Sequence, residues 1–148
     1  MVKQTIVEFL ERDLNTLKLE IEKYKSDDDL WKVADGISNC AGNLCLHLCG
    51  NLKHYIGALL GHTGYIRHRD AEFDLKDIPA HALIADIDIT KNIVTETLQK
   101  LSDADLLKTF PDLKHGKSVT ALHMLLHLML HFQYHLGQIN YHRRILGS

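Results

Sequence analysis

Four histidines recur at every fourth residue near the end of this chain: His123, His127, His131 and His135, which we call the histidine ladder. His142 follows them, and 11 of the 148 residues are histidine. In a helix, residues four apart lie on one face, one turn from each other. Imidazole is the side chain that proteins use most often to bind transition metals. The spacing therefore predicts a helix face suited to holding a divalent metal ion.

The helical phase favours some of these histidines over others. At about 100° per residue, His123 lies about 80° from His131, whereas four residues lie within about 40° of it: His127, His135, Gln138 and His142. A stripe at this spacing normally faces the core of a helical bundle. A buried polar group without a partner costs roughly 1–3 kcal/mol there. A bound metal would supply the missing partner.

Two histidines do not complete a catalytic site, which usually has three protein ligands and one open position. The helix expected over about 38–60 offers His47 and His54 on one face, about 10 Å apart along the axis. One of these two is therefore expected to join the ion of the ladder. Asn51 lies near the same face and is expected to hydrogen-bond a ligand.

The ladder lacks the general base of the His-Glu-x-x-His helix of zinc proteases, because no glutamate lies between His131 and His135. Two neighbouring histidines, His127 and His142, are the candidates for that role. The alternative is that the histidines merely line a core or form hydrogen bonds with neighbouring helices.

Composition excludes several classes of function. The formal net charge is −2 and 24% of residues are charged, with no basic tract, so we expect no nucleic-acid partner. The most apolar stretch, 121–130, contains two histidines and is too short to span a bilayer. No signal peptide is visible. The odd cluster of Cys40, Cys45 and Cys49 argues against a disulfide framework, and we expect a cytoplasmic protein.

Hydrophobic periodicity predicts four helices to position these residues, over about 3–24, 38–60, 82 or 90 to 101, and 118–146. Ser38 and Ser118 are the expected N-caps of the second and fourth helices. Pro79 and Pro111 lie in the breaks. The long segment 61–82 is enough chain to cross the length of a helix, so the second and third helices could be parallel. The prediction is a single all-α domain over 1–148: a four-helix bundle with a long crossover between helices two and three.

The crossover carries a cluster of charged side chains: Arg67, Arg69, Asp70 and Glu72. We favour an ion-paired loop that folds over the end of the bundle. Arginines that hold an anionic substrate near the metal are the alternative.

Two motifs resemble the DinB/YfiT-like superfamily of helical-bundle proteins. They are His-Phe-Gln-Tyr-His over 131–135, followed by Leu-Gly-Gln-Ile, and His-Leu-Cys-Gly-Asn-Leu from position 47. The resemblance covers most of the chain and implies a three-histidine site made by His47, His131 and His135. Nickel or zinc is the implied metal. The expected pocket residues around it are His127, Gln138, His142, Asn51 and His54.

The resemblance implies a metal-dependent enzyme with a small-molecule substrate. Members with assigned activity include transferases that use low-molecular-weight thiols, and hydrolysis is the other reaction that such a metal supports. A non-catalytic metal-binding or ligand-binding protein is the main alternative. We also expect a homodimer, because the predicted fourth helix carries more apolar residues than one core stripe needs: Leu122, Leu126, Met129 and Leu130.

Overall fold

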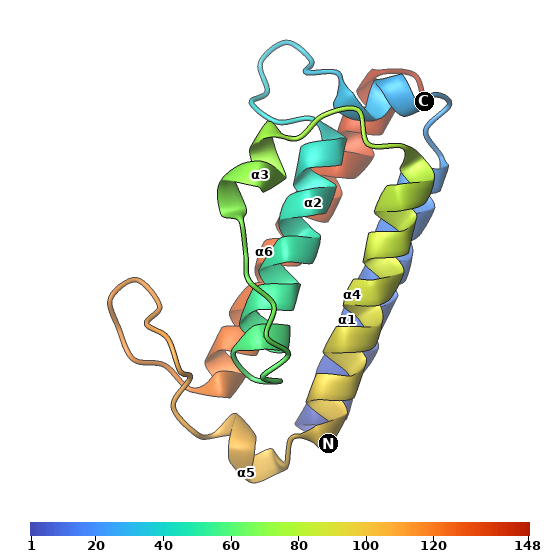
Figure 1. The fold of residues 1–148 in the computed structure, drawn as a ribbon. Helices are drawn as coiled ribbons and strands as arrows, with labels where there is room; N and C mark the ends of the chain where they lie inside the picture. Colours follow the sequence, from blue (N-terminus) through green and yellow to red (C-terminus); the bar gives the residue numbers. More distant parts are fainter.

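Four long helices form a bundle in the computed structural model, which describes residues 1–148 (Figure 1). They are α1 (Val2–Glu22), α2 (Ala41–Leu52), α4 (Ala80–Lys100) and α6 (Ala121–Ile145). A π-helical segment, η2 (Lys53–Ala58), continues α2 without a break. The shorter elements are the 3₁₀-helix η1 (Asp27–Trp31), α3 (Arg69–Asp74) and α5 (Asp103–Leu106).

The direction of the helices follows from the long connection after η2. In Figure 1, α1 and α6 run one way along the bundle, and α2 and α4 run the other way. Helix α1 packs beside α4 and α6, and α2 packs beside the same two helices. Residues 59–79 carry the chain back along the bundle, with α3 within this return path. The predicted all-α four-helix bundle with a crossover between parallel second and third helices is confirmed.

Apolar spacing explains why α1 forms and which face it buries. Its buried apolar residues recur at intervals of three and four: Ile6, Leu10, Leu14, Leu17 and Ile21. Two acidic residues on this helix are also buried, and both have partners. Asp13 is paired with Arg12, and Glu20 accepts hydrogen bonds from Asn140 and Arg143 of α6. The contacts of Glu20 fix α1 against α6 at the end of the bundle opposite the N-terminus.

Helix α2 is the most buried element, with only Leu46 partly exposed among its twelve residues. Two glycines make room for side chains from other segments. A Cβ on Gly42 would lie 2.7 Å from the ring of Trp31, and a Cβ on Gly50 would overlap with Oε2 of Glu72. The glycines therefore let Trp31 and Glu72 lie directly against the helix.

Several predicted boundaries are wrong. The second helix begins at Ala41 rather than at Ser38, and the fourth begins at Ala121, where Thr120 accepts the capping hydrogen bond from the backbone N–H of His123. Thr90 does not start the third helix, since α4 begins directly after Pro79. The segment 61–82 is not wholly irregular, because it contains α3 and the first turn of α4.

The rotation of α6 also differs from the expectation. Its fully buried positions belong mainly to apolar residues, among them Leu125, Leu128, Phe132 and Ile139. The ladder lies beside this core stripe, where His127, His131 and His135 are only half-buried and His123 is exposed. The apolar side chains occupy the core, so the histidines face the neighbouring helix α2.

The remaining global expectations concern membranes and thiols. No helix is both long enough and apolar enough to cross a membrane. All three cysteines are buried and free, as the sequence predicts.

Candidate metal centre

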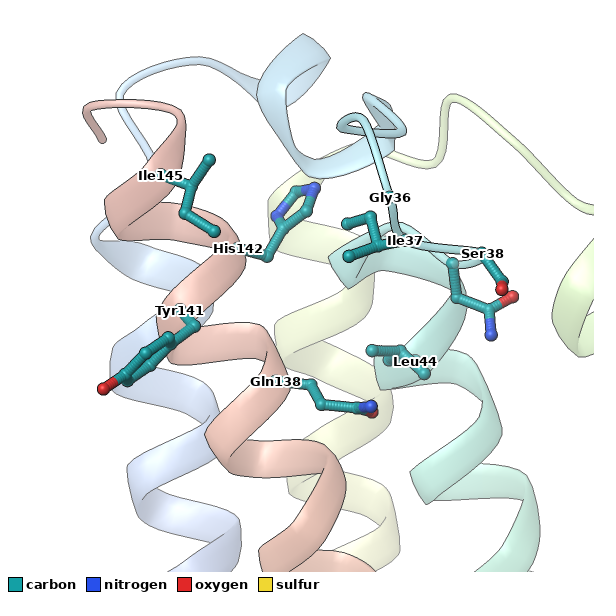
Figure 2. A pocket seen from close by; sticks show the side chains of 9 residues that line it. Gly36, Ile37, Ser38, Leu44, Gln138, Tyr141, His142 and Ile145 are labelled. Carbon is teal, nitrogen blue, oxygen red and sulfur yellow. The ribbon is translucent and has the colours of Figure 1, made fainter.

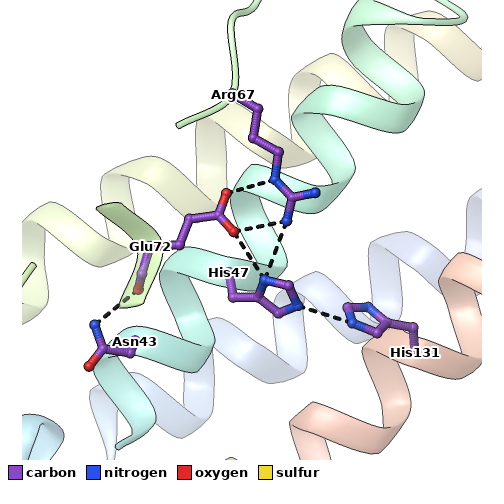
Figure 3. A network of polar contacts seen from close by, with 5 residues as sticks. All are labelled: Asn43, His47, Arg67, Glu72 and His131. Atoms are coloured by element: carbon purple, nitrogen blue, oxygen red, sulfur yellow. Dashed lines mark hydrogen bonds and ion pairs between the residues drawn. The ribbon is translucent and has the colours of Figure 1, made fainter. Parts of the chain in front are cut away.

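Three imidazoles from two helices converge beside the core, and Figure 3 shows two of them, His47 and His131. His47 comes from α2, and His131 and His135 come from successive turns of α6. One potential ligand atom of each lies within 4.8 Å of the others. His47 Nε2 and His131 Nε2 are 3.1 Å apart. The structure thus brings together the three residues that the sequence selects, which we call the histidine triad.

Glu72 fixes the orientation of His47. Its Oε1 lies 3.0 Å from His47 Nδ1, and both residues are buried. Arg67 holds the same carboxylate through two hydrogen bonds of 2.8 and 2.9 Å. Burial opposes ionisation of Glu72, but the hydrogen bonds from Arg67 and His47 outweigh it and keep the pKa of Glu72 below its ordinary value. Glu72 is therefore a carboxylate and an acceptor.

The acceptor at Nδ1 decides where the lone pair of His47 points. Arg67 Nη2 also lies 3.3 Å from His47 Nδ1, but a guanidinium only donates. The Nδ1–H therefore donates a hydrogen bond to Glu72, and in the neutral ring the lone pair lies on Nε2, which faces His131. A carboxylate behind a histidine in this way is the usual support of a metal ligand, because it orients the ring and raises its basicity.

His135 has an equivalent partner on its own helix. Gln138 Oε1 lies 2.7 Å from His135 Nδ1 and accepts a hydrogen bond from its N–H, which leaves the lone pair of the ring on Nε2. Burial lowers the pKa of His135 and outweighs the hydrogen bond to Gln138, which raises it. The ring is thus held neutral, the state in which imidazole binds metals.

His131 is the member of the triad that the protein leaves unsatisfied. Its Nδ1 is the one buried side-chain nitrogen or oxygen without a hydrogen-bond partner. Burial, and after it the nearby His135 and His47, lower the pKa of His131 to about 3. The lowered pKa values of His131 and His135 keep these two rings neutral, and both face His47. Such a donor set fits a cation.

The spacing of the triad also fits a metal. Two nitrogens that each bind one ion at about 2.0–2.1 Å lie roughly 2.9–3.4 Å apart, for bond angles between 90° and tetrahedral. The 3.1 Å between His47 Nε2 and His131 Nε2 falls in this range. Three imidazoles without a fourth protein ligand correspond to a catalytic zinc-type set rather than to a closed structural one.

A cavity of about 310 Å³ opens onto His47 and His131. Two of the expected pocket residues, Asn51 and His127, line it. Burial, and after it the charges of Lys114 and His115, lower the pKa of His127. The ring of His127 stacks beside His131 with centroids 6.4 Å apart. A neutral imidazole thus borders the space in front of the triad.

The structure does not bring His54 and His142 to the triad. The ring of His54 packs against Tyr55 and does not line the cavity. His142 is buried, with Nδ1 2.7 Å from Tyr24 Oη and Nε2 2.7 Å from the carbonyl oxygen of Lys32. With both nitrogens engaged, His142 connects α6 to the turn that follows α1 and to the segment after η1.

A second cavity, of about 380 Å³, lies between the start of α2 and the end of α6 (Figure 2). His142 and Gln138 line it together with apolar side chains, among them Leu44, Tyr141 and Ile145. None of the histidine triad lines it. Gln138 thus reaches from this cavity to His135.

Sequence reasoning includes Gln138, the partner of His135, among the expected pocket residues, but it misses the contact between Glu72 and His47. The expected ion-paired loop does exist, since Glu72 pairs with Arg67, but Glu72 also contacts His47. The pattern gives no reason to connect Gly50 with this contact, although the Glu72 carboxylate occupies the space beside Gly50. The only sign of this contact in the sequence is that an acidic residue, Glu72, lies in the long crossover.

Comparisons with known proteins identify the family and the fold of the chain. Residues 4–148 match the family model described as "Protein of unknown function (DUF1572)". Among solved structures, the chain is similar to one described by the words "YfiT from Bacillus subtilis is a probable metal-dependent hydrolase with an unusual four-helix bundle topology". The TM-score is 0.78 at 21% sequence identity, over 98% of this chain and 87% of that chain. A search of curated proteins gives no significant match.

The family match covers nearly the whole chain, and the structural likeness confirms the fold that the two histidine motifs imply. The chain therefore belongs to the DUF1572 family, and its bundle is of the DinB/YfiT-like type.

Proposed function

We propose that the protein is a metal-dependent hydrolase of small molecules, with a divalent ion held by His47, His131 and His135. The observation that carries the proposal is the support behind the triad. Glu72 and Gln138 each occupy an Nδ1 atom, so two Nε2 lone pairs are directed into the triad before any ion binds. The similar YfiT protein, described as a probable metal-dependent hydrolase, points to the same class of reaction.

The chain supplies the other parts that a hydrolase needs. A bound ion would contribute Lewis acidity at the open position. His127 borders the same cavity and makes no hydrogen bond, and its lowered pKa keeps it neutral, so it would accept a proton from the attacking water. Asn51 is buried on the cavity wall and would orient a polar group of the substrate.

Thiol transfer is the second candidate, because a thiolate could occupy the same open position. All three cysteines are buried, and none lines the cavity. A thiol would therefore arrive as a low-molecular-weight co-substrate. A dependence of turnover on added thiol distinguishes this reaction from hydrolysis.

The test is metal analysis of the purified protein together with activity assays. Zinc or nickel is expected at about one ion per chain, since imidazole ligands suit both. His135→Ala should lose the ion and all turnover on a panel of ester, amide and thiol-transfer substrates. His123→Ala is the matched control, because His123 is an exposed ladder histidine outside the triad.

Two outcomes would contradict the proposal. If wild-type protein takes up no metal on reconstitution, the histidine triad is not a metal centre. Metal binding with a fourth protein ligand and no turnover would indicate a non-catalytic binding protein instead.

We also propose a homodimer in the cytoplasm. Five large apolar side chains are exposed along one side of α6: Leu126, Leu130, Tyr134, Tyr141 and Ile145. Such a row on a helix is typical of a surface covered by a partner, and a symmetric second copy is the most common partner. Three unpaired thiols accord with a reducing compartment.

A further inference from the structure

The cavity in front of the triad is lined by positive charge. Three basic side chains border it, Arg67, Arg69 and Lys114, and no aspartate or glutamate does. His47 and His131 form another part of the same wall. A concave surface with one sign of charge concentrates ligands of the opposite sign. The cavity therefore favours an anionic group close to the triad.

The pairing of these cations shows which of them are available. Arg67 donates to Glu72 through Nε and Nη2, while its Nη1 makes no hydrogen bond within the protein. The side chains of Arg69 and Lys114 form neither an ion pair nor a hydrogen bond. By contrast, the cations Lys53 and Arg143, which also lie between helices, have carboxylate partners. Arg69 and Lys114 thus lack an anion.

Local structure holds the two cations at the rim. Arg69 is the first residue of α3, and its guanidinium lies over the ring of Phe73 at 5.3 Å from the centroid. Lys114 lies in the connection between α5 and α6, where backbone hydrogen bonds of 2.8 and 3.0 Å to Lys117 close a tight turn. Phe110, which is buried, anchors the same connection through a bond to Val119. Both cations are therefore attached to ordered backbone.

We propose that the substrate carries an oxyanion, either a phosphate or a carboxylate, which Arg69 and Lys114 bind while the reacting part extends to the histidine triad. Arg67 also lines the cavity, with Nη2 3.3 Å from His47 Nδ1, and its free Nη1 supplies a third donor. Arginine matches the geometry of two anionic oxygens, and lysine adds a point charge. This inference rests on the proposed function for the choice of substrate, but the anion site itself does not need the ion.

Binding measurements on the full-length protein test the proposal. Inorganic phosphate and succinate are the probes, and each is titrated into the protein by calorimetry, with and without a chelator. Wild-type protein should bind at least one of them saturably in both conditions. The double variant Arg69→Gln/Lys114→Gln should bind it at least about tenfold more weakly, since each removed contact involves a charged group. The probe that binds more tightly shows whether the oxyanion of the substrate is a phosphate or a carboxylate.

The matched control is Lys117→Gln/Arg144→Gln. It removes the same charge from side chains that do not line the cavity, and one of them lies in the same turn as Lys114. Control and wild type should bind the probe equally well, and the metal content of both double variants should equal that of wild type.

Each contrary result has a distinct meaning. If neither probe binds saturably, or if both double variants weaken binding equally, the anion site is overturned, whatever the metal content. If the chelator abolishes binding and the double variant does not, the anion sits on the ion and the proposal fails. If wild type binds no metal, the proposed function fails, while binding of the probe in chelator still decides this inference.

Discussion

The contact between Glu72 and His47 determines which ring nitrogen of His47 faces the triad. Because the hydrogen bonds from Arg67 and His47 keep the pKa of Glu72 below its ordinary value, Glu72 is a carboxylate at neutral pH and accepts a hydrogen bond from the Nδ1–H of His47. The sequence predicts the three ligands, since their spacing and motifs are local. It does not predict Glu72, because its position depends on the path of the crossover.

Replacing the carboxylate should weaken metal binding without unfolding the protein. In Glu72→Gln the amide can still accept from His47, but it loses the charge that pairs with Arg67 and that raises the basicity of the ring. Metal affinity should fall by about 10–100-fold, measured by competition with a coloured chelator. Asp70→Asn, an exposed acid on the same short helix, is the control and should bind like wild type.

His131 should make the stability of the metal-free protein depend on pH. In the unfolded chain this imidazole takes up a proton near pH 6.5, whereas in the folded protein it does so only near pH 3. Between these values the unfolded state binds more protons, so the free energy of unfolding should decrease as the pH falls from about 6.5.

Urea unfolding in the presence of a chelator, at pH 7.5 and pH 5, measures this effect. His131→Gln should show a smaller decrease than wild type, because other titrating groups are common to both. Equal decreases in the two proteins would show that His131 titrates normally when folded.

At the scale of elements, α2 provides both a ligand and the space for the group that supports it. His47 and Gly50 lie one turn apart, and the missing side chain of Gly50 leaves room for Glu72. Periodicity predicts the existence and order of the long helices. It fails at the starts of α2 and α4, because the caps Cys40 and Pro79 carry no side-chain capping bond that a pattern could reveal.

Replacing a helical glycine by alanine should be harmful at Gly50 and favourable at Gly137. Gly50→Ala would place a Cβ in the space of the Glu72 carboxylate, so Glu72 must move and metal affinity should fall by about 10–100-fold. A Cβ at Gly137 would meet no atom within 4 Å. Gly137→Ala should therefore stabilise α6 by up to about 1 kcal/mol, because alanine has the higher helix propensity.

Thermal unfolding and metal titration of both variants provide the comparison. A Gly50→Ala protein with wild-type metal affinity would show that Glu72 does not have to contact His47 at Nδ1.

At the scale of the whole molecule, the parallel pairing of α2 and α4 requires a long return path, and that path carries Arg67, Arg69 and Glu72. The bundle topology therefore supplies the support of the triad as well as one side of the cavity. The sequence predicts this crossover from its length. It cannot predict where along the bundle each charged side chain comes to rest, because many packed contacts decide that together.

The exposed row on α6 should mediate self-association. Wild-type protein should sediment as a dimer at micromolar concentration, and Leu130→Glu should sediment as a monomer, because a charge would be buried without a partner. Leu107→Glu is the control, since Leu107 and Leu130 are similarly exposed, at 70% and 72%, and Leu107 lies off α6. A monomeric wild type would contradict the dimer.

The two helices that hold the triad are far apart along the chain, since His47 and His131 are separated by 84 positions. An ion shared by them acts as a cross-link that closes a loop of more than half the chain. The entropic cost of closing such a loop grows with its length, so the unfolded chain rarely brings the three imidazoles together. The ion would then bind after the bundle has assembled and would be released before or during its opening. Its main mechanical effect would be on the rate of unfolding, because the loaded protein would have to release its ion before the bundle could open.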